Sequence, residues 1–174
     1  MKLSAVALPA LLCLCCISCK PNNADKIVGA WQEVRVLNPQ LDDALFKQNT
    51  FADTVGTSTD SLQNIEFYGA TNIDSFKLRA KANLDSFRKY QFYSIRATIF
   101  DFQKGGKMYL HSLDGVDTAK WFIDDDGALI LDQEHKGEGS KIRMEIAEIS
   151  DTLLQLKYKE QYSESTAVFK PVKK

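Results

Sequence analysis

The chain has 174 residues with 22 basic and 23 acidic side chains, so its formal net charge is only −1 at pH 7. A nucleic-acid-binding protein usually carries a basic stripe, whereas the most basic stretch here, FKPVKK at the C-terminus, is typical of a solvated tail. We therefore predict no nucleic-acid partner. A chain of this length is long enough for one domain with a substantial core and too short for two.

The first 18 residues have the layout of a secretory signal. Lys2 supplies a positive start, the apolar run LSAVALPALLCLCCIS follows, and the chain then changes abruptly to KPNNADK. A transmembrane helix needs about 20 apolar residues, whereas this run is shorter, contains Pro9 and ends in small residues. We expect residues 1–18 to be removed, which leaves 156 residues with a net charge of −2 because Lys2 is the only charge lost.

All four cysteines lie between residues 13 and 19. The segment CISC that ends at Cys19 resembles the lipobox of bacterial lipoproteins, in which a small residue precedes a cysteine that is acylated and becomes the first residue of the mature protein. The resemblance implies lipid attachment at Cys19, a short membrane tether over residues 19–26, and a place in the bacterial cell envelope. In some lipoproteins an aspartate directly after the acylated cysteine is associated with retention in the inner membrane. Lys20 stands at this position here, which favours the outer membrane and leaves both of its leaflets open. An ordinary signal peptide is the alternative, since the family prefers Leu where Cys16 stands.

The segment after the tether opens with a strand. In KIVGAWQEVRVL, residues 26–37, Ile27, Gly29 and Trp31 share one face of an alternating pattern. We therefore predict a strand of eight or more residues here.

The period changes to a helical one between residues 39 and 93. PQLDDALFKQNTF places Pro39 at a helix start, and TNIDSFKLRAKANLDSFRKYQFY has apolar residues at spacings of three and four, with Asn72 or Thr71 available as the cap. These patterns predict a short helix and an amphipathic helix of about 20 residues. LQNIEFYG, which lies between them, is compatible with either a strand or a helical turn.

The rest of the chain reads as antiparallel sheet. Seven alternating segments are separated by turn signals that include KGGK, Asp114-Gly115 and DDDG at 124–127. In chain order the segments are IRATIFDFQ, MYLHSL, TAKWFID, ALILD, KIRMEIAEI, DTLLQLKY and SESTAVFK. With the first strand they make eight, the number that closes into a barrel just wide enough to be packed by side chains or to hold one small ligand.

Eight strands in meander order, opened by Gly29-Ala30-Trp31, resemble the lipocalin superfamily and, more specifically, the lipocalin-like domains of envelope lipoproteins. The matching segments are VGAWQEV, FDFQKGGKMY, KWFIDDDGALIL and ISDTLLQLKY. The resemblance implies a mainly β fold over residues 27–174: an eight-stranded antiparallel meander barrel whose base is closed by Gly29 and Trp31. The chain departs from the family in a helical insertion at about 39–93, between strands 1 and 2.

Few residues suggest chemistry. The acidic run at 124–127 fails the calcium-loop pattern, which needs an aspartate where Phe122 stands, so we interpret it as a hairpin turn. His111 and His135, the only histidines, lack the spacing and the partners of a zinc site. The hydroxyl and carboxyl groups beside His111 lack a nucleophile elbow. We therefore predict no catalytic residue, no metal and no cofactor, and a protein that is not an enzyme.

The sequence leaves two main hypotheses for function, and a third, a hydrolase that acts on envelope polymers, rests only on the abundance of acidic and hydroxyl side chains. The first is a lipid-anchored, non-enzymatic protein that binds a small apolar or amphipathic ligand at the envelope, with the helical insertion gating or capping one end of the barrel. The second is a packed barrel that acts as a protein–protein interaction or scaffold module, whose helical insertion then shows an exposed apolar patch and whose partner is unknown. The side chains that either line or fill the barrel are Phe100, Phe102, Tyr109, Trp121, Ile142 and Met144.

Overall fold

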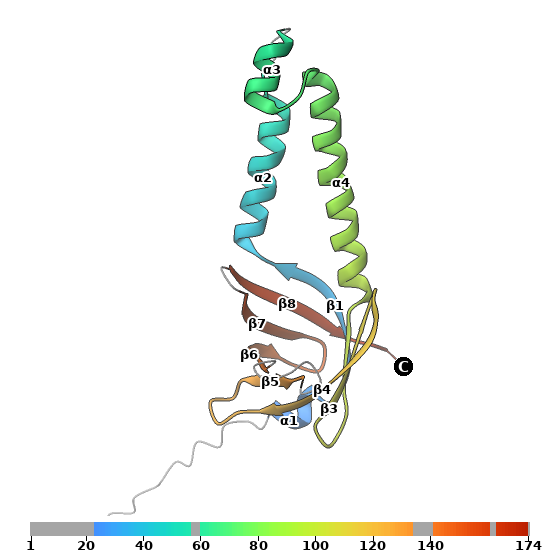
Figure 1. Cartoon of the computed structure of the whole chain (residues 1–174). Helices are drawn as coiled ribbons and strands as arrows, with labels where there is room; N and C mark the ends of the chain where they lie inside the picture. The colour runs from blue at the N-terminus through green and yellow to red at the C-terminus, as the bar shows by residue number, and fades with distance from the viewer. Residues whose placement is uncertain (1–22, 57–59, 134–140, 161–162, 174) are drawn as a thin grey trace, which may run out of the picture.

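The chain forms a closed barrel of eight antiparallel strands, with helices inserted between the first two (Figure 1). The computed structural model describes residues 23–56, 60–133, 141–160 and 163–173. Each strand pairs with the next along the chain, and the last pairs with the first. The predicted fold class is confirmed. Cys19 and His135 lie outside the described residues.

The strands and helices follow the predicted order. The strands are β1 (Gly29–Leu37), β2 (Ile99–Phe102), β3 (Lys107–Ser112), β4 (Gly115–Ile123), β5 (Leu129–Asp132), β6 (Lys141–Ile149), β7 (Leu154–Glu160) and β8 (Ser163–Pro171). The helices are α1 (Asn23–Ile27), α2 (Pro39–Thr54), α3 (Ser61–Tyr68) and α4 (Ile73–Ala97).

The start of β1 differs from the expectation, because Ile27 ends α1 and does not belong to the strand. The chain passes from α1 into β1 at Gly29. Its φ is +134°, a backbone conformation that residues with a side chain rarely adopt. The indole Nε1 of the buried Trp31 donates a hydrogen bond to the Ile27 carbonyl oxygen at 2.8 Å. The Gly-x-Trp opening thus fastens α1 to one end of the barrel. Asn23 to Lys26, the end of the predicted tether, lie in α1.

The barrel interior is a packed apolar core. Phe102 lies edge-on to Trp121 with ring centroids 5.4 Å apart, and Phe100 lies 4.9 Å from Phe169. The indole Nε1 of Trp121 donates to the carbonyl oxygens of Gln103 and Lys107. The buried cluster comprises Ile27, Trp31, Phe100, Phe102, Met108, Ala119, Trp121, Leu129, Leu131, Met144, Leu154, Leu156, Ala167 and Phe169.

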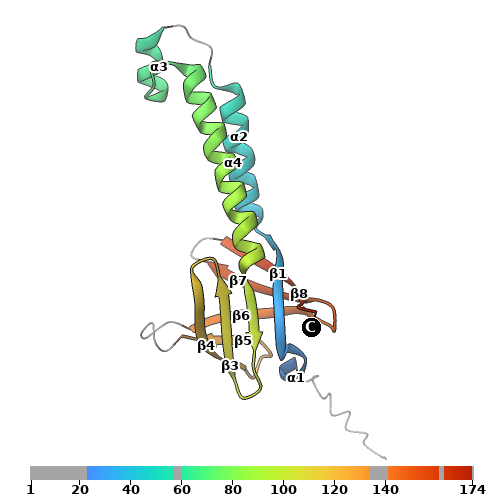
Figure 2. The ribbon, with the colours of Figure 1, turned by 90° about the vertical axis from the view of Figure 1, so that its right-hand side faces the viewer.

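Helices α2, α3 and α4 form an arm that projects from the barrel (Figures 1 and 2). α2 and α4 run side by side in opposite directions, and α3 lies at the far end. At ~1.5 Å per residue, the 25 residues of α4 extend about 37 Å. α1 lies at the opposite end of the barrel from the arm. The insertion therefore rises from one barrel end and extends away from it.

Side chains cap all three arm helices, and the cap of α4 is one of the two residues that the sequence predicted. The Asn38 side chain accepts from the Leu41 amide at 2.9 Å, with Pro39 at the first helical position. Asn72 accepts from the Ser75 amide at 2.8 Å and begins α4.

Two helix predictions need adjustment. The ambiguous segment LQNIEFYG lies within and just after α3, which ends where Gly69 adopts the left-handed conformation. α4 continues to Ala97 instead of ending near Tyr93, so β2 is shorter than its alternating pattern suggested. Within the described ranges, no helix has the length and apolarity that crossing a membrane requires.

Candidate functional site

The six predicted cavity residues do not share one surface. Phe100, Phe102, Trp121 and Met144 are buried in the core. Tyr109 follows the fully buried Met108, so strand alternation directs it to the outer face, where the Lys107 Nζ lies 4.6 Å from its ring centroid. Ile142, near the start of β6, is exposed. Ile142 nevertheless pairs with the buried Leu131, so it lies on the inward face of β6, and only the first four are buried together. The role of these residues in ligand binding stays a prediction.

The centre of the barrel is filled by protein. Met108, Leu129, Leu154 and Leu156 have no accessible surface. A cavity large enough for water beside them would leave part of their surface accessible. The fold is compatible with lipocalin-like ligand binding, but any ligand space in the interior lies away from these four side chains.

Glu33 places an ionisable side chain in this apolar interior. It lies two residues after Trp31 on β1, pairs with Phe169 of β8 and is only 8% exposed. Burial raises the pKa of its carboxyl group to about 7, and a hydrogen bond with the Thr98 side chain acts in the opposite direction. A carboxyl group with this pKa can exchange a proton near neutral pH, but general acid or base chemistry also needs contact with a substrate. The alternation of Gly29, Trp31 and Glu33 was the signal that could have identified it.

Amide side chains join the arm to the barrel. The Asn38 Nδ2 donates to the Ser165 Oγ of β8 at 2.9 Å while its Oδ1 caps α2. On β1, the Gln32 Nε2 donates to the carbonyl oxygens of Arg96 and Thr98, at 2.8 and 2.9 Å. The start of α2 and the end of α4 are thus each bonded to the barrel, and these contacts fix the root of the arm.

The arm carries most of the exposed large apolar side chains among the described residues. Few of its apolar side chains are buried; they include Ala52, Val55, Ile73 and Leu84. By contrast, Phe46, Leu62, Phe67 and Leu78 are each at least 70% exposed. The exposed set in the arm is Phe46, Phe51, Leu62, Ile65, Phe67, Leu78, Phe87, Tyr90, Phe92 and Tyr93.

An apolar groove runs between α2 and α4, and we call it the arm groove. Its volume is about 460 Å³, within the range of ~300–1,000 Å³ for small-ligand pockets. Leu84 is buried there, whereas Phe51 and Phe87 remain 49% and 41% exposed. The remaining lining residues are Leu41, Ala44, Leu45, Gln48, Ala80 and Asn83.

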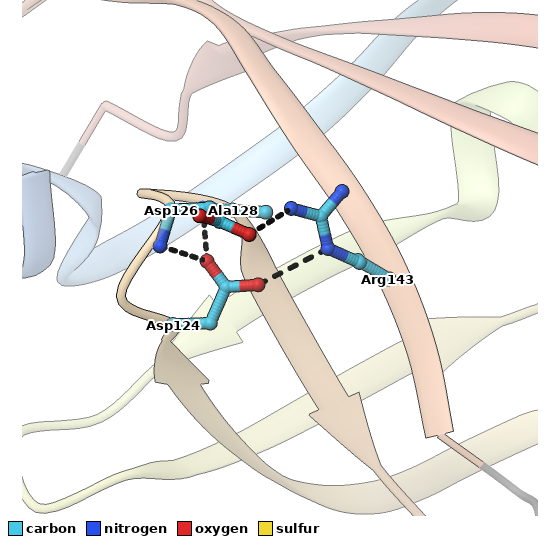
Figure 3. A network of polar contacts seen from close by, with 4 residues as sticks. All are labelled: Asp124, Asp126, Ala128 and Arg143. Carbon is cyan, nitrogen blue, oxygen red and sulfur yellow. Dashed lines mark hydrogen bonds and ion pairs between the residues drawn. The ribbon is translucent and has the colours of Figure 1, made fainter.

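The acidic run at 124–127 is a hairpin turn, as predicted (Figure 3). The Asp124 Oδ1 accepts from the amides of Ala128 and Asp126, at 2.8 and 3.1 Å, and its Oδ2 accepts from the Arg143 Nε at 3.1 Å. These contacts, the Ala128 hydrogen bond foremost, lower the pKa of Asp124. The carboxylate is already used by the turn and by β6.

Metal ligands are not grouped in the part of the chain that the structure describes: no three His, Cys, Asp or Glu residues there could hold an ion together. His111 lies in β3 opposite Val116 of β4.

Comparison with models of protein families, with curated proteins and with solved structures found no match. The description of the fold therefore rests on the topology of the barrel alone. A closed meander of eight antiparallel strands is consistent with a lipocalin-like fold.

Proposed function

We propose that the protein is a lipid-anchored, non-enzymatic lipocalin-like protein of the bacterial cell envelope that acts as an interaction module. Its packed barrel is the platform and its arm is the binding surface. The observation that carries this proposal is the concentration of exposed apolar side chains on α2, α3 and α4.

The arm has more apolar surface than its own fold buries. Most helices in globular proteins are stabilised by tertiary packing of an amphipathic face. Here α2 and α4 pack against each other along one side, yet Phe51 and Phe87 at their seam stay partly exposed. Large exposed apolar patches on a soluble domain mark interaction sites. A partner that covers the arm would remove this surface from water.

The position of α1 favours an arm that points away from the anchoring membrane. With Cys19 acylated, only residues 20–22 separate the anchor from α1, and at ~3.3 Å per residue this linker spans roughly 13 Å from Cys19. α1 lies at the barrel end opposite the arm. The barrel base then sits near the lipid, while the arm extends toward a partner.

Photo-crosslinking in cells tests the binding surface. A photoreactive amino acid at Phe67, in the arm, is expected to give a discrete crosslinked protein product. The matched control is Val116, which is similarly exposed but lies on barrel strand β4. Crosslinks from Val116 alone, or from neither position, would contradict the proposal.

The anchor has its own test. Cys19→Ala is expected to abolish incorporation of labelled fatty acid and to move the protein out of the membrane fraction. Cys13→Ala, which lies outside the CISC segment, is the control that should retain both. Equal labelling of Cys19→Ala and the unmodified sequence would exclude acylation at this position.

A small apolar or amphipathic ligand is the second candidate, and the volume of the arm groove favours it. Native mass spectrometry of residues 20–174 after purification is the direct test. A reproducible adduct of defined mass supports a carrier. Bare protein in repeated preparations leaves the interaction module as the function of the groove.

A further inference from the structure

We infer that the arm groove binds the arm of a second copy of this chain, so that α2 and α4 of two protomers form a four-helix bundle. The two-fold axis runs parallel to the helices. This inference rests on the proposed function, because it names the partner of the same surface.

The two long helices of the arm are half of such a bundle. In a four-helix bundle each helix packs against two neighbours around a shared apolar core. In the arm, α2 and α4 each have only one long helix as a neighbour, namely the other. The arm groove lies between them, with Leu84 buried and Phe51 and Phe87 partly exposed. A second arm placed on the groove supplies the missing neighbours. Because both partners present the same surface, the interface is isologous and closes at two copies.

The two helices carry net charges of opposite sign, and one ion pair between them, from the Lys81 Nζ to the Asp53 Oδ1 at 2.6 Å, lies within the arm. α2 contains three aspartates and one lysine, a net charge of −2, whereas α4 contains six basic and two acidic residues, a net charge of +4. A two-fold axis parallel to the helices places α2 of one copy opposite α4 of the other. An axis perpendicular to the helices, lying in the interface, places α4 on α4 and opposes like charges. Electrostatic complementarity fixes register more than affinity, so it selects the parallel axis.

The membrane geometry favours the same axis for an independent reason. A parallel axis leaves both barrels at one end of the bundle, with both α1 helices pointing away from it. Two lipid anchors can then enter one membrane. The perpendicular axis would put the barrels, and hence the anchors, at opposite ends of the bundle.

Mass measurement by size exclusion with light scattering is the first test, on residues 20–174, which contain every described residue. We expect twice the monomer mass. Ala44→Glu places a charged side chain in the groove and is expected to weaken the dimer at least tenfold. Ala82→Glu is the matched control, because Ala82 is also an exposed alanine of the arm but does not line the groove. Circular dichroism of both variants verifies that they fold.

Disulfide trapping in membranes of the full-length chain tests the orientation. Gln48→Cys on α2 and Asn83→Cys on α4 both line the groove and are exposed. Copies that carry one or the other are expected to crosslink when coexpressed, whereas Gln48→Cys alone is not. Self-crosslinking of Gln48→Cys without the mixed product would overturn the parallel axis.

The two proposals fail in different ways. A monomer that still gives an arm-specific photo-crosslink to a different protein overturns self-association and keeps the interaction module. A monomer without any arm crosslink overturns both. A dimer that Ala44→Glu and Ala82→Glu leave equally intact overturns the groove as its interface.

Discussion

The barrel and the arm bury their apolar side chains to very different extents. In the barrel, Phe102, Leu154 and Phe169 are at most 1% exposed, because the sheet closes on itself and each inward side chain meets others. In the arm, two long helices cover only one side of each other, and Phe46 and Phe67 are largely exposed. The same residue type therefore serves stability in one region and is available for binding in the other.

The contrast separates the residues that stabilise the fold from the surface that we propose binds a partner. A closed barrel leaves no unpaired strand edge, so it offers no edge at which another chain could add a strand. The arm is bonded to that barrel at its root through Asn38 and Gln32. The barrel can therefore hold in place an arm that is poorly packed by itself.

The largest effect is expected from a core aromatic residue. Phe102→Ala should lower the free energy of unfolding by about 3–5 kcal/mol, because it removes buried area and leaves a cavity. Phe67→Ala, the matched change in the arm, should change it by less than about 0.5 kcal/mol in the monomer. Urea denaturation followed by tryptophan fluorescence measures both, since Trp31 and Trp121 lie in the barrel. Equal losses of unfolding free energy in the two variants would contradict the difference between barrel and arm.

The next effect concerns Glu33 and pH. Its pKa is raised to about 7 in the folded protein, above its unfolded value of 4.5, so the folded state holds the proton more tightly. Its contribution to stability is therefore fully present below pH 4.5 and is lost as the pH rises through about 7. The loss amounts to about 3 kcal/mol at ~1.4 kcal/mol per pKa unit.

Glu33→Gln should remove this pH dependence. Urea denaturation at pH 5 and pH 8 is expected to show a smaller difference for the variant than for the unmodified protein. Parallel pH profiles for the two would show that the carboxyl group is not titrating in this range.

A smaller effect is expected at the root of the arm. Asn38→Ala removes the α2 cap and the bond to Ser165, so we expect a loss of about 1–2 kcal/mol in stability. Asn72→Ala removes a cap of the same kind at the start of α4 and is the control. The difference between their unfolding midpoints measures the barrel contact, and identical losses would mean that this contact contributes nothing.

The smallest effect is expected in the turn of Figure 3. Asp124→Asn keeps an acceptor oxygen for the Ala128 amide and loses the ion pair with Arg143, which is solvent-exposed and therefore weak. The pKa of Asp124 is lowered in the folded state, so its contribution is present above the unfolded pKa and is lost as the pH falls through the folded value. Thermal unfolding over a series of decreasing pH values should therefore separate the variant from the unmodified protein most at pH 6, and progressively less as the pH falls through the folded pKa of Asp124. Asp125→Asn in the same turn is the control.

Much of the barrel was predictable because strands leave a period of two in the sequence. Turn glycines and the Gly-x-Trp opening marked where the strands begin and end. Tyr109 was harder to place, since Met108, Tyr109 and Leu110 make both faces of β3 apolar. Glu33 carried a usable signal, because it alternates with Trp31.

The arm was predictable as helices but not in its arrangement. A stripe of apolar residues such as Ile73, Ala80 and Leu84 indicates that one helix face is covered, and it does not identify what covers it. Leu78, Phe92 and Tyr93 provided a further signal, because their exposed apolar side chains add to that stripe. The arm groove could be located only after α2 and α4 were placed side by side.

The position of β1 has a consequence for how fast the chain folds. β2 to β8 pair with strands next to them in sequence, whereas β1 must find β2 across the whole arm and β8 across the rest of the chain. Contacts between distant residues form slowly, because loop closure precedes any gain in bonding. We expect β1 to join last, so that substitutions in β1 mainly accelerate unfolding and leave the folding rate nearly unchanged.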